Sequence, residues 1–181
     1  MNTLTVLIMS LLVGFNLPDK IDFGKRESAS DWRVINDGVM GGLSQGQVAF
    51  TSNSVRFYGT VSLANNGGFA SFRSPFTKID LSPFKSISFR LRNTGIRCAF
   101  TLEIDRRFWM PNFKHQIVTQ TEDWEIIELP LAEFKRYRLG RASGGSLPDQ
   151  VKSEIIRMGW ITDEKKEGPF SLEVDYIQFN R

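Results

Sequence analysis

Cysteine and histidine are nearly absent from this sequence of 181 residues, which contains one of each, Cys98 and His115. A single cysteine excludes an internal disulfide framework and any cysteine-rich zinc or iron–sulfur site. A single histidine removes most histidine-based metal and acid–base chemistry. We therefore expect no metal site, no cofactor and no catalytic residue, with Cys98 as a buried small hydrophobic residue and His115 as a surface residue on a strand.

The motifs of common enzyme classes are missing as well. There is no G-x-S-x-G nucleophile elbow, and the glycine-rich segment 36–42 is not followed by Gly-Lys-Ser/Thr, so it is not a phosphate loop. A glycosidase needs two carboxylates about 5 to 10 Å apart, which Glu103, Asp105 and Glu128 would supply only if strand pairing brought them together. The sequence favours a protein that is not an enzyme, and an enzyme of unknown chemistry is the alternative.

Long hydrophobic runs and a strong charge of one sign are also missing. The 23 Lys and Arg against 20 Asp and Glu give a formal charge of +3, too weak to indicate nucleic acid. The longest apolar run, 4–15, is shorter than the roughly 20 residues that span a bilayer. We interpret residues 1–18 as a secretory signal or anchor, with a buried first strand or a misassigned start codon as alternatives. Export, or membrane contact only through this segment, would follow; otherwise the protein is cytoplasmic.

Alternating apolar and polar residues dominate the remainder, 19–181, which we expect to form one domain. At least five strands are predicted, at 54–63, 86–92, 100–104, 124–129 and 170–179. The last changes phase between Val174 and Ile177, which indicates a β-bulge or burial on both faces. One or two helical turns are expected within Pro148–Met158. Short strands separated by Gly and Asn turns, without βαβ alternation, predict an antiparallel β-sandwich or jelly roll.

Two segments are more specific than composition. Residues 32–44 read W-R-V-I-N-D-G-V-M-G-G-L-S, and residues 59–73 read G-T-V-S-L-A-N-N-G-G-F-A-S-F-R. Both resemble the signature of the complex I intermediate-associated protein family, and the similarity continues in W-E-I-I-E-L-P-L-A-E-F at 124–134 and in later strands up to about Phe179. One position departs from that pattern, because Leu139 stands where the family's R-G-R loop has its first arginine.

This resemblance implies a jelly-roll sandwich similar to galactose-binding-like and carbohydrate-binding modules. It also implies a role like that of the family's mitochondrial members, which assist the assembly of NADH:ubiquinone oxidoreductase by holding incomplete membrane subcomplexes. We therefore expect a non-enzymatic binding or assembly factor with a protein partner, for which membrane subunits of a respiratory complex are the candidates. Folds of this kind host many unrelated functions, so the role is carried over by analogy.

The partner surface is expected on the polar faces of the strands, where arginines alternate with apolar residues. Arg56 and Tyr58 lie on one predicted strand, Arg73 on the next, and Arg90 with Arg92 on a third. If these strands pair in register, the side chains form one surface that can bind carboxylates or stack on flat ligands. The structural alternative is an ordinary solvated sheet face.

A carbohydrate-binding module is the alternative function. Trp109 and Tyr58 would stack on sugar rings, and the amides of Asn65 and Asn66 would bind hydroxyls. In the structural interpretation of the same residues, the turn at 65–68 closes an antiparallel hairpin and Trp109 packs under its own loop.

The glycine-rich loop 36–42 allows a similar pair of interpretations. Its backbone N–H groups could form a nest for an anion or hydroxyl, or the loop could cross the end of the sandwich while Val39 and Met40 plug the core. We also expect Phe57, Phe69 and Phe72 to lie in the core.

Overall fold

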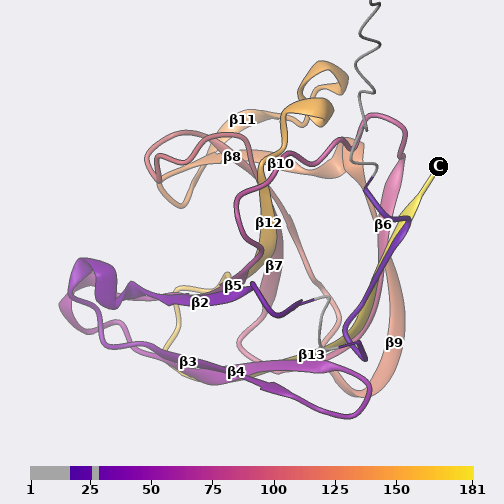
Figure 1. Cartoon of the computed structure of the whole chain (residues 1–181). Helices are drawn as coiled ribbons and strands as arrows, with labels where there is room; N and C mark the ends of the chain where they lie inside the picture. Colours follow the sequence, from indigo (N-terminus) through magenta and orange to yellow (C-terminus); the bar gives the residue numbers. More distant parts are fainter. Residues whose placement is uncertain (1–16, 26–28) are drawn as a thin grey trace, which may run out of the picture.

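The computed structural model describes residues 17–25 and 29–181. Within them the chain forms thirteen β-strands in two antiparallel sheets that pack face to face (Figure 1). The described part of the chain contains no helix with the length and apolar character needed to cross a bilayer. Most of the predicted signal or anchor segment, 1–18, lies outside the described residues, so that assignment stays a prediction.

The first layer, sheet A, has the strand order β3-β4-β13-β6-β9, and β1 also pairs with β13. All five predicted strands are present, and β4, β6, β9 and β13 place four of them in this sheet. Register shifts between Val174 and Tyr176 in β13, which confirms the predicted bulge. The strand bounds are β1 Lys20–Asp22, β3 Gln45–Phe50, β4 Val55–Val61, β6 Ser86–Gly95, β9 Thr121–Pro130 and β13 Gly168–Asn180.

The second layer, sheet B, has the order β11-β10-β8-β7-β12-β5-β2. It is strongly curved: β2 and β5 form one wing and β8, β10 and β11 the other, on either side of β7 and β12, so the concave side faces away from sheet A (Figure 1). The strand bounds are β2 Arg33–Asn36, β5 Ala70–Arg73, β7 Cys98–Glu103, β8 Asn112–Gln116, β10 Lys135–Arg138, β11 Arg141–Ser146 and β12 Arg157–Thr162.

Aromatic rings fill the space between the sheets. Trp160 of β12 is fully buried, and its ring centroid lies 5.4 Å from that of Trp32, 5.3 Å from Phe100 and 6.2 Å from Phe72. Burial of each such ring contributes roughly 1.5 to 3 kcal/mol, so this cluster is a main source of stability. Cys98 is also fully buried as predicted, and burial raises the pKa of its thiol.

Within residues 17–25 and 29–181, the short 3-10 helices η2 to η5 connect strands. Of these, η5 lies within the predicted helical segment 148–158, which confirms that prediction, and Pro148 precedes it as the N-cap residue. The helices are η2 Asp37–Met40, η3 Ala64–Asn66, η4 Leu131–Glu133 and η5 Asp149–Glu154.

Two expectations about the core were wrong. Val39 and Met40 do not plug it: their exposed fractions are 75% and 65%, because η2 turns the side chain of Asp37 inward and theirs outward. Phe57 and Phe72 are core residues as expected, whereas Phe69 is only half-buried.

Candidate functional site

Four of the predicted partner residues share the outward face of sheet A. Arg56 and Tyr58 lie on β4, Arg90 and Arg92 lie on β6, and β13 separates the two strands. Arg56 is exposed and donates from Nε to the Oγ of Ser171 at 3.0 Å. The structure therefore brings these four residues onto one surface, with a strand between them that sequence reasoning had not placed there.

Acidic side chains of that intervening strand neutralise two of the arginines. Glu173 accepts hydrogen bonds from Nε and Nη2 of Arg92 at 2.9 and 2.7 Å, and from the hydroxyl of Ser54 at 2.6 Å. Arg90 donates to Asp175 at 2.5 Å. Two of the three arginines considered on this face thus have an acidic partner. The alternation in 170–179 marks Glu173 as outward-facing, but only the strand order reveals its partner.

Aromatic rings on this face are covered by cations. The guanidinium of Arg56 lies 5.0 Å from the ring centroid of Tyr58. Those of Arg90 and Arg92 lie 4.6 and 5.1 Å from the ring of Trp124. Cation–π contacts of this kind occupy the ring faces that a sugar would need for stacking.

Arg73 belongs to the other layer. It lies on β5 of sheet B, because the chain crosses between the sheets after β4, and the pairing that would join Arg73 to Arg56 does not occur. Its strand neighbours are instead Gly159 of β12 and Arg33 of β2. The expected single surface is therefore divided into two faces on opposite sides of the molecule.

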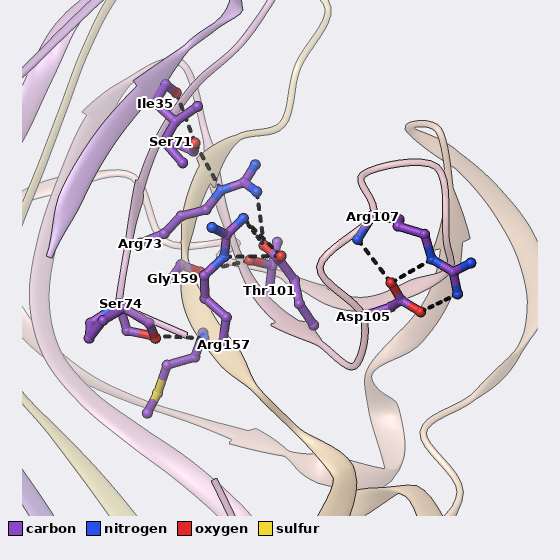
Figure 2. A network of polar contacts seen from close by, with 12 residues as sticks. Ile35, Ser71, Arg73, Ser74, Thr101, Asp105, Arg107, Arg157 and Gly159 are labelled. Atoms are coloured by element: carbon purple, nitrogen blue, oxygen red, sulfur yellow. Dashed lines mark hydrogen bonds and ion pairs between the residues drawn. The ribbon is translucent and has the colours of Figure 1, made fainter. Parts of the chain in front are cut away.

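A carboxylate shared by two arginines dominates the outward face of sheet B (Figure 2). Arg73 Nη1 lies 2.8 Å from Oε1 of Glu103, and Arg157 donates from Nε to Oε2 at 3.0 Å. The three side chains are only 18%, 10% and 12% exposed, in the order Arg73, Glu103, Arg157. Burial lowers the pKa of the Arg73 guanidinium, although the charge of Glu103 acts in the opposite direction. The cluster carries one excess positive charge.

Polar residues on this concave face are unusually buried for outward-facing side chains. Ser71 is 0% exposed, Thr101 4% and Lys114 9%. Lys114 pairs with Asp163 and covers the ring of Tyr137 at 3.8 Å. The curvature of sheet B explains this burial, since its two wings partly enclose the central strands (Figure 1).

Further cations line this face without acidic partners. Arg106 lies 4.8 Å from the ring of Phe76, whose other cation contact is Arg157 at 4.0 Å. Arg33 and Lys135 are exposed on the outer strands, next to Arg73 and Lys114 respectively. Among the described residues, none of Arg33, Arg106 and Lys135 forms an ion pair. Cations therefore exceed acidic groups on sheet B, in contrast to sheet A.

The two signature segments meet at a corner between the sheets, around the buried carboxylate of Asp37. It accepts hydrogen bonds from the backbone N–H and hydroxyl of Ser44 at 2.9 and 2.6 Å, and from the N–H groups of Gly68 and Phe69 at 2.6 and 3.2 Å. Burial raises the pKa of Asp37, but the hydrogen bonds from Ser44, Gly68 and Phe69 outweigh it, so the pKa lies below its usual value. The carboxylate of Asp37 therefore joins the two signature segments, and we call it and its donors the hub.

Two glycines of the signature are required by this hub. A Cβ on Gly42 would lie 2.4 Å from the Asp37 carboxyl carbon, and one on Gly67 would lie 2.6 Å from its Oδ2. Larger residues would force the carboxylate out of its hydrogen bonds. The loop 36–42 therefore contributes to structure by supplying the carboxylate of Asp37, and the N–H groups of Gly41 and Gly42 bond to backbone carbonyls of the same loop.

Asn65 and Asn66 lie at the same corner. Both have left-handed backbones, with φ of 56° and 61°, and Asn65 donates from Nδ2 to the carbonyl of Gly41 at 3.1 Å. The predicted hairpin at 65–68 was wrong, because the segment joins β4 of sheet A to β5 of sheet B. The amide of Asn65 thus holds two loops together, and Asn66 is exposed.

Trp109 lies in the loop between β7 and β8 and does not pack under it. Its exposed fraction is 45%, that of Phe108 is 70%, and their rings meet edge to face at 5.2 Å. Arg138 donates to the carbonyl of Trp109 at 3.2 Å, which ties the loop to the β10–β11 hairpin. Near the edge of the concave face, the loop therefore presents two aromatic side chains to solvent.

Strand pairing does not bring together Glu103 and Glu128, two of the carboxylates considered for glycosidase chemistry. Glu103 lies on sheet B and is held by two arginines, whereas Glu128 lies on β9 of sheet A. Asp105 accepts hydrogen bonds from Arg107, which lower the pKa of Asp105 to about 2.

His115 lies on β8 as predicted, with its side chain 20% exposed and its ring beside Phe134.

The sequence matches one family model and a curated mouse protein. A model of the family described as Complex I intermediate-associated protein 30 (CIA30) matches residues 21–174. The mitochondrial Complex I intermediate-associated protein 30 of Mus musculus is 24% identical over 176 residues, covering 86% of this chain and 53% of that protein. The chain thus spans about half the length of this relative.

Solved structures of similar fold are carbohydrate-binding modules and agarases. The family 11 module of the cellulase Lic26A-Cel5E from Clostridium thermocellum has a TM-score of 0.61 at 17% identity, covering 83% of this chain and 88% of that one. A family 11 module from the same organism, in complex with a β-1,3-1,4-mixed-linked tetrasaccharide, has a TM-score of 0.59 at 18% identity, with 83% and 89% covered. At such identities the likeness shows the fold alone, and it confirms the predicted jelly-roll β-sandwich.

Proposed function

Because the family model spans most of the sandwich, this chain belongs to the Complex I intermediate-associated protein 30 family, and we propose that it is a non-enzymatic assembly factor that holds a protein partner. The family's name describes association with intermediates of a respiratory complex. Subunits of NADH:ubiquinone oxidoreductase are accordingly the partners to test. The fold itself does not select this role, since sandwiches of this kind serve many functions.

The excess of cations on the concave face of sheet B supports docking of an acidic protein segment there. Arg73 and Arg157 share the single carboxylate of Glu103, and these ion pairs hold the two guanidinium groups in fixed orientations. Arg33 and Lys135 extend the positive surface to both wings. Arginines fixed by neighbouring groups bind carboxylates at a smaller entropic cost than free ones, and like-charged partners are rejected.

Affinity purification of the tagged full chain from its source cells tests the proposal. We expect subunits of the respiratory complex to co-purify, and the double variant Arg33→Glu with Lys135→Glu to lose them. Both side chains are exposed and form no ion pair among the described residues, so the sandwich should remain folded. Their hydrogen bonds go to the carbonyls of Ser30 and Trp32 and to the hydroxyl of Ser146. Recovery of no such subunit with the unmodified chain would contradict the proposed function.

A matched control carries the same change of charge on the other side of the molecule. Arg56→Glu with Lys85→Glu alters two exposed cations, one on β4 of sheet A and one immediately before β6. We expect this control to retain the partner. Loss of the partner in the sheet A variant alone would instead assign docking to the surface of Arg56, Tyr58, Arg90 and Arg92.

Carbohydrate binding is the second candidate, favoured by the exposed pair Phe108 and Trp109 at the edge of a sandwich that shares its fold with sugar-binding modules. They are the exposed aromatic side chains of the described residues, whereas half-buried rings such as those of Tyr58 and Phe76 have a cation over them. Glycan-array binding by the full chain that disappears in Trp109→Ala would support this candidate. Absence of selective sugar retention by the unmodified protein would reject it.

A further inference from the structure

An apolar tip projects from the corner that the two signature segments build. It consists of Val39, Met40, Leu43 and Leu63, which are 75%, 65%, 58% and 40% exposed. Hydrogen bonds hold its two loops together, from Ser62 N–H to the Ser44 hydroxyl at 3.0 Å and from Asn65 to Gly41. The core does not need these four side chains, so their apolar character calls for a partner outside the molecule.

Several backbone groups of the tip have hydrogen-bond partners within the protein. Asp37 accepts N–H groups from both loops, as described above, and the N–H groups of Gly41 and Gly42 bond to the carbonyls of Gly38 and Asp37 at 3.1 Å each. Entry of a loop into a medium of low polarity is costly when backbone groups lose their hydrogen bonds to water. This tip retains its internal hydrogen bonds wherever its apolar side chains go.

Cations border the tip on the loop that connects β12 and β13. The carboxylates of this loop are engaged inside the protein: Asp163 by Lys114, Glu164 by Arg97, and Glu167 by the N–H of Leu63 at 2.9 Å. Lys165 and Lys166 are exposed and form no ion pair within the part of the chain that is described. The hydrogen bond from Leu63 to Glu167 places this loop, with its two exposed lysines and the carboxylate of Glu167, directly beside the tip.

We propose that the tip inserts into the surface of a bilayer containing anionic lipids, with Lys165 and Lys166 on the lipid phosphates. Four apolar side chains on convex turns, bordered by unpaired lysines, match the layered polarity of a membrane surface, where apolar groups reach the acyl boundary and cations meet the headgroups. This contact is independent of the protein partner proposed above. The sequence analysis expected membrane contact through residues 1–18 alone, and the tip would be a second contact.

A probe at position 40 tests insertion of the tip itself, which matters because the apolar run 4–15 can also bind vesicles. Cys98 is 0% exposed and should not react, so Met40→Cys in the full chain can be labelled selectively with an environment-sensitive fluorophore. On phosphatidylcholine vesicles containing phosphatidylglycerol, we expect a blue shift and quenching by brominated acyl chains. A polar environment at position 40 on bound protein, or no binding at all, would overturn the proposal.

Two controls sharpen this test. Ile126→Cys carries the same probe on an exposed apolar position, 66% exposed, on the edge strand β9 of sheet A, and its emission should not shift. Lys165→Glu with Lys166→Glu should weaken the blue-shifted state at position 40 by about tenfold or more on anionic vesicles. If position 40 stays polar on protein-free vesicles but becomes apolar with the respiratory subunits, the tip binds protein rather than lipid.

Discussion

The two outward faces of the sandwich contain similar residues but differ in charge balance and burial. On sheet A, Arg90 and Arg92 each have an acidic partner on β13, and their side chains are 37% and 42% exposed. On sheet B, two arginines share Glu103, and all three side chains are less than 20% exposed. A face on which two arginines have acidic partners of their own and a concave face with excess cations have different capacities for binding, although both consist of arginine-rich strands.

The difference shows that arginine content alone does not define a binding surface. What matters is whether each cation already has an anionic partner and whether water can reach it, because an exposed ion pair contributes little energy and a buried one is strongly coupled to its surroundings. Substitution of one acidic residue on each face, and of one at the corner between the sheets, compares how much each carboxylate contributes to the free energy of unfolding.

Glu103→Ala should have the largest effect. It leaves Arg73 and Arg157 partly buried and without a counter-charge, and we expect a loss of about 3 to 5 kcal/mol in the free energy of unfolding. Urea denaturation followed by tryptophan fluorescence measures this loss. A decrease below about 1 kcal/mol would mean that water reaches these arginines as easily as those of sheet A.

Asp37→Ala should be next, with a loss of about 3 kcal/mol at neutral pH, because N–H groups of both loops lose their acceptor. The pKa of Asp37 is lowered in the folded protein, so the unfolded chain binds more protons as pH falls below about 4. The stabilisation is therefore complete above that pH and disappears as pH falls through the depressed pKa. The difference in the free energy of unfolding between the two proteins should therefore decrease as pH falls below about 4; a constant difference would contradict this role.

Glu173→Ala should have the smallest effect, about 1 to 2 kcal/mol. Its carboxylate is buried, but its partner Arg92 can turn to solvent once the carboxylate is removed, and Ser54 loses one hydrogen bond. Urea denaturation of the three variants measures whether their losses in the free energy of unfolding follow this order. A loss equal to that of Glu103→Ala would remove the energetic distinction between the two faces.

Much of the fold could be predicted from the sequence, and less of the candidate site. Alternation in 54–63 and 170–179 identifies the buried positions and even the bulge near Asp175. Alternation does not reveal that Arg56 pairs with Glu173 or that Arg73 lies in the other sheet, because these neighbours come from distant parts of the chain. The exposed tip was missed for a similar reason: Val39 and Met40 are apolar, and only the inward position of Asp37 turns them to solvent.

The sequence by itself determined the class of the fold, the strands, the apolar core and the family, since all of these depend on local alternation and on contiguous motifs. Tertiary structure alone decided which outward side chains share a face, which cations remain without a partner and which apolar residues stay outside. Those outcomes depend on the order in which strands pair, and pairing is set by contacts among residues far apart in the chain, which local periodicity does not encode.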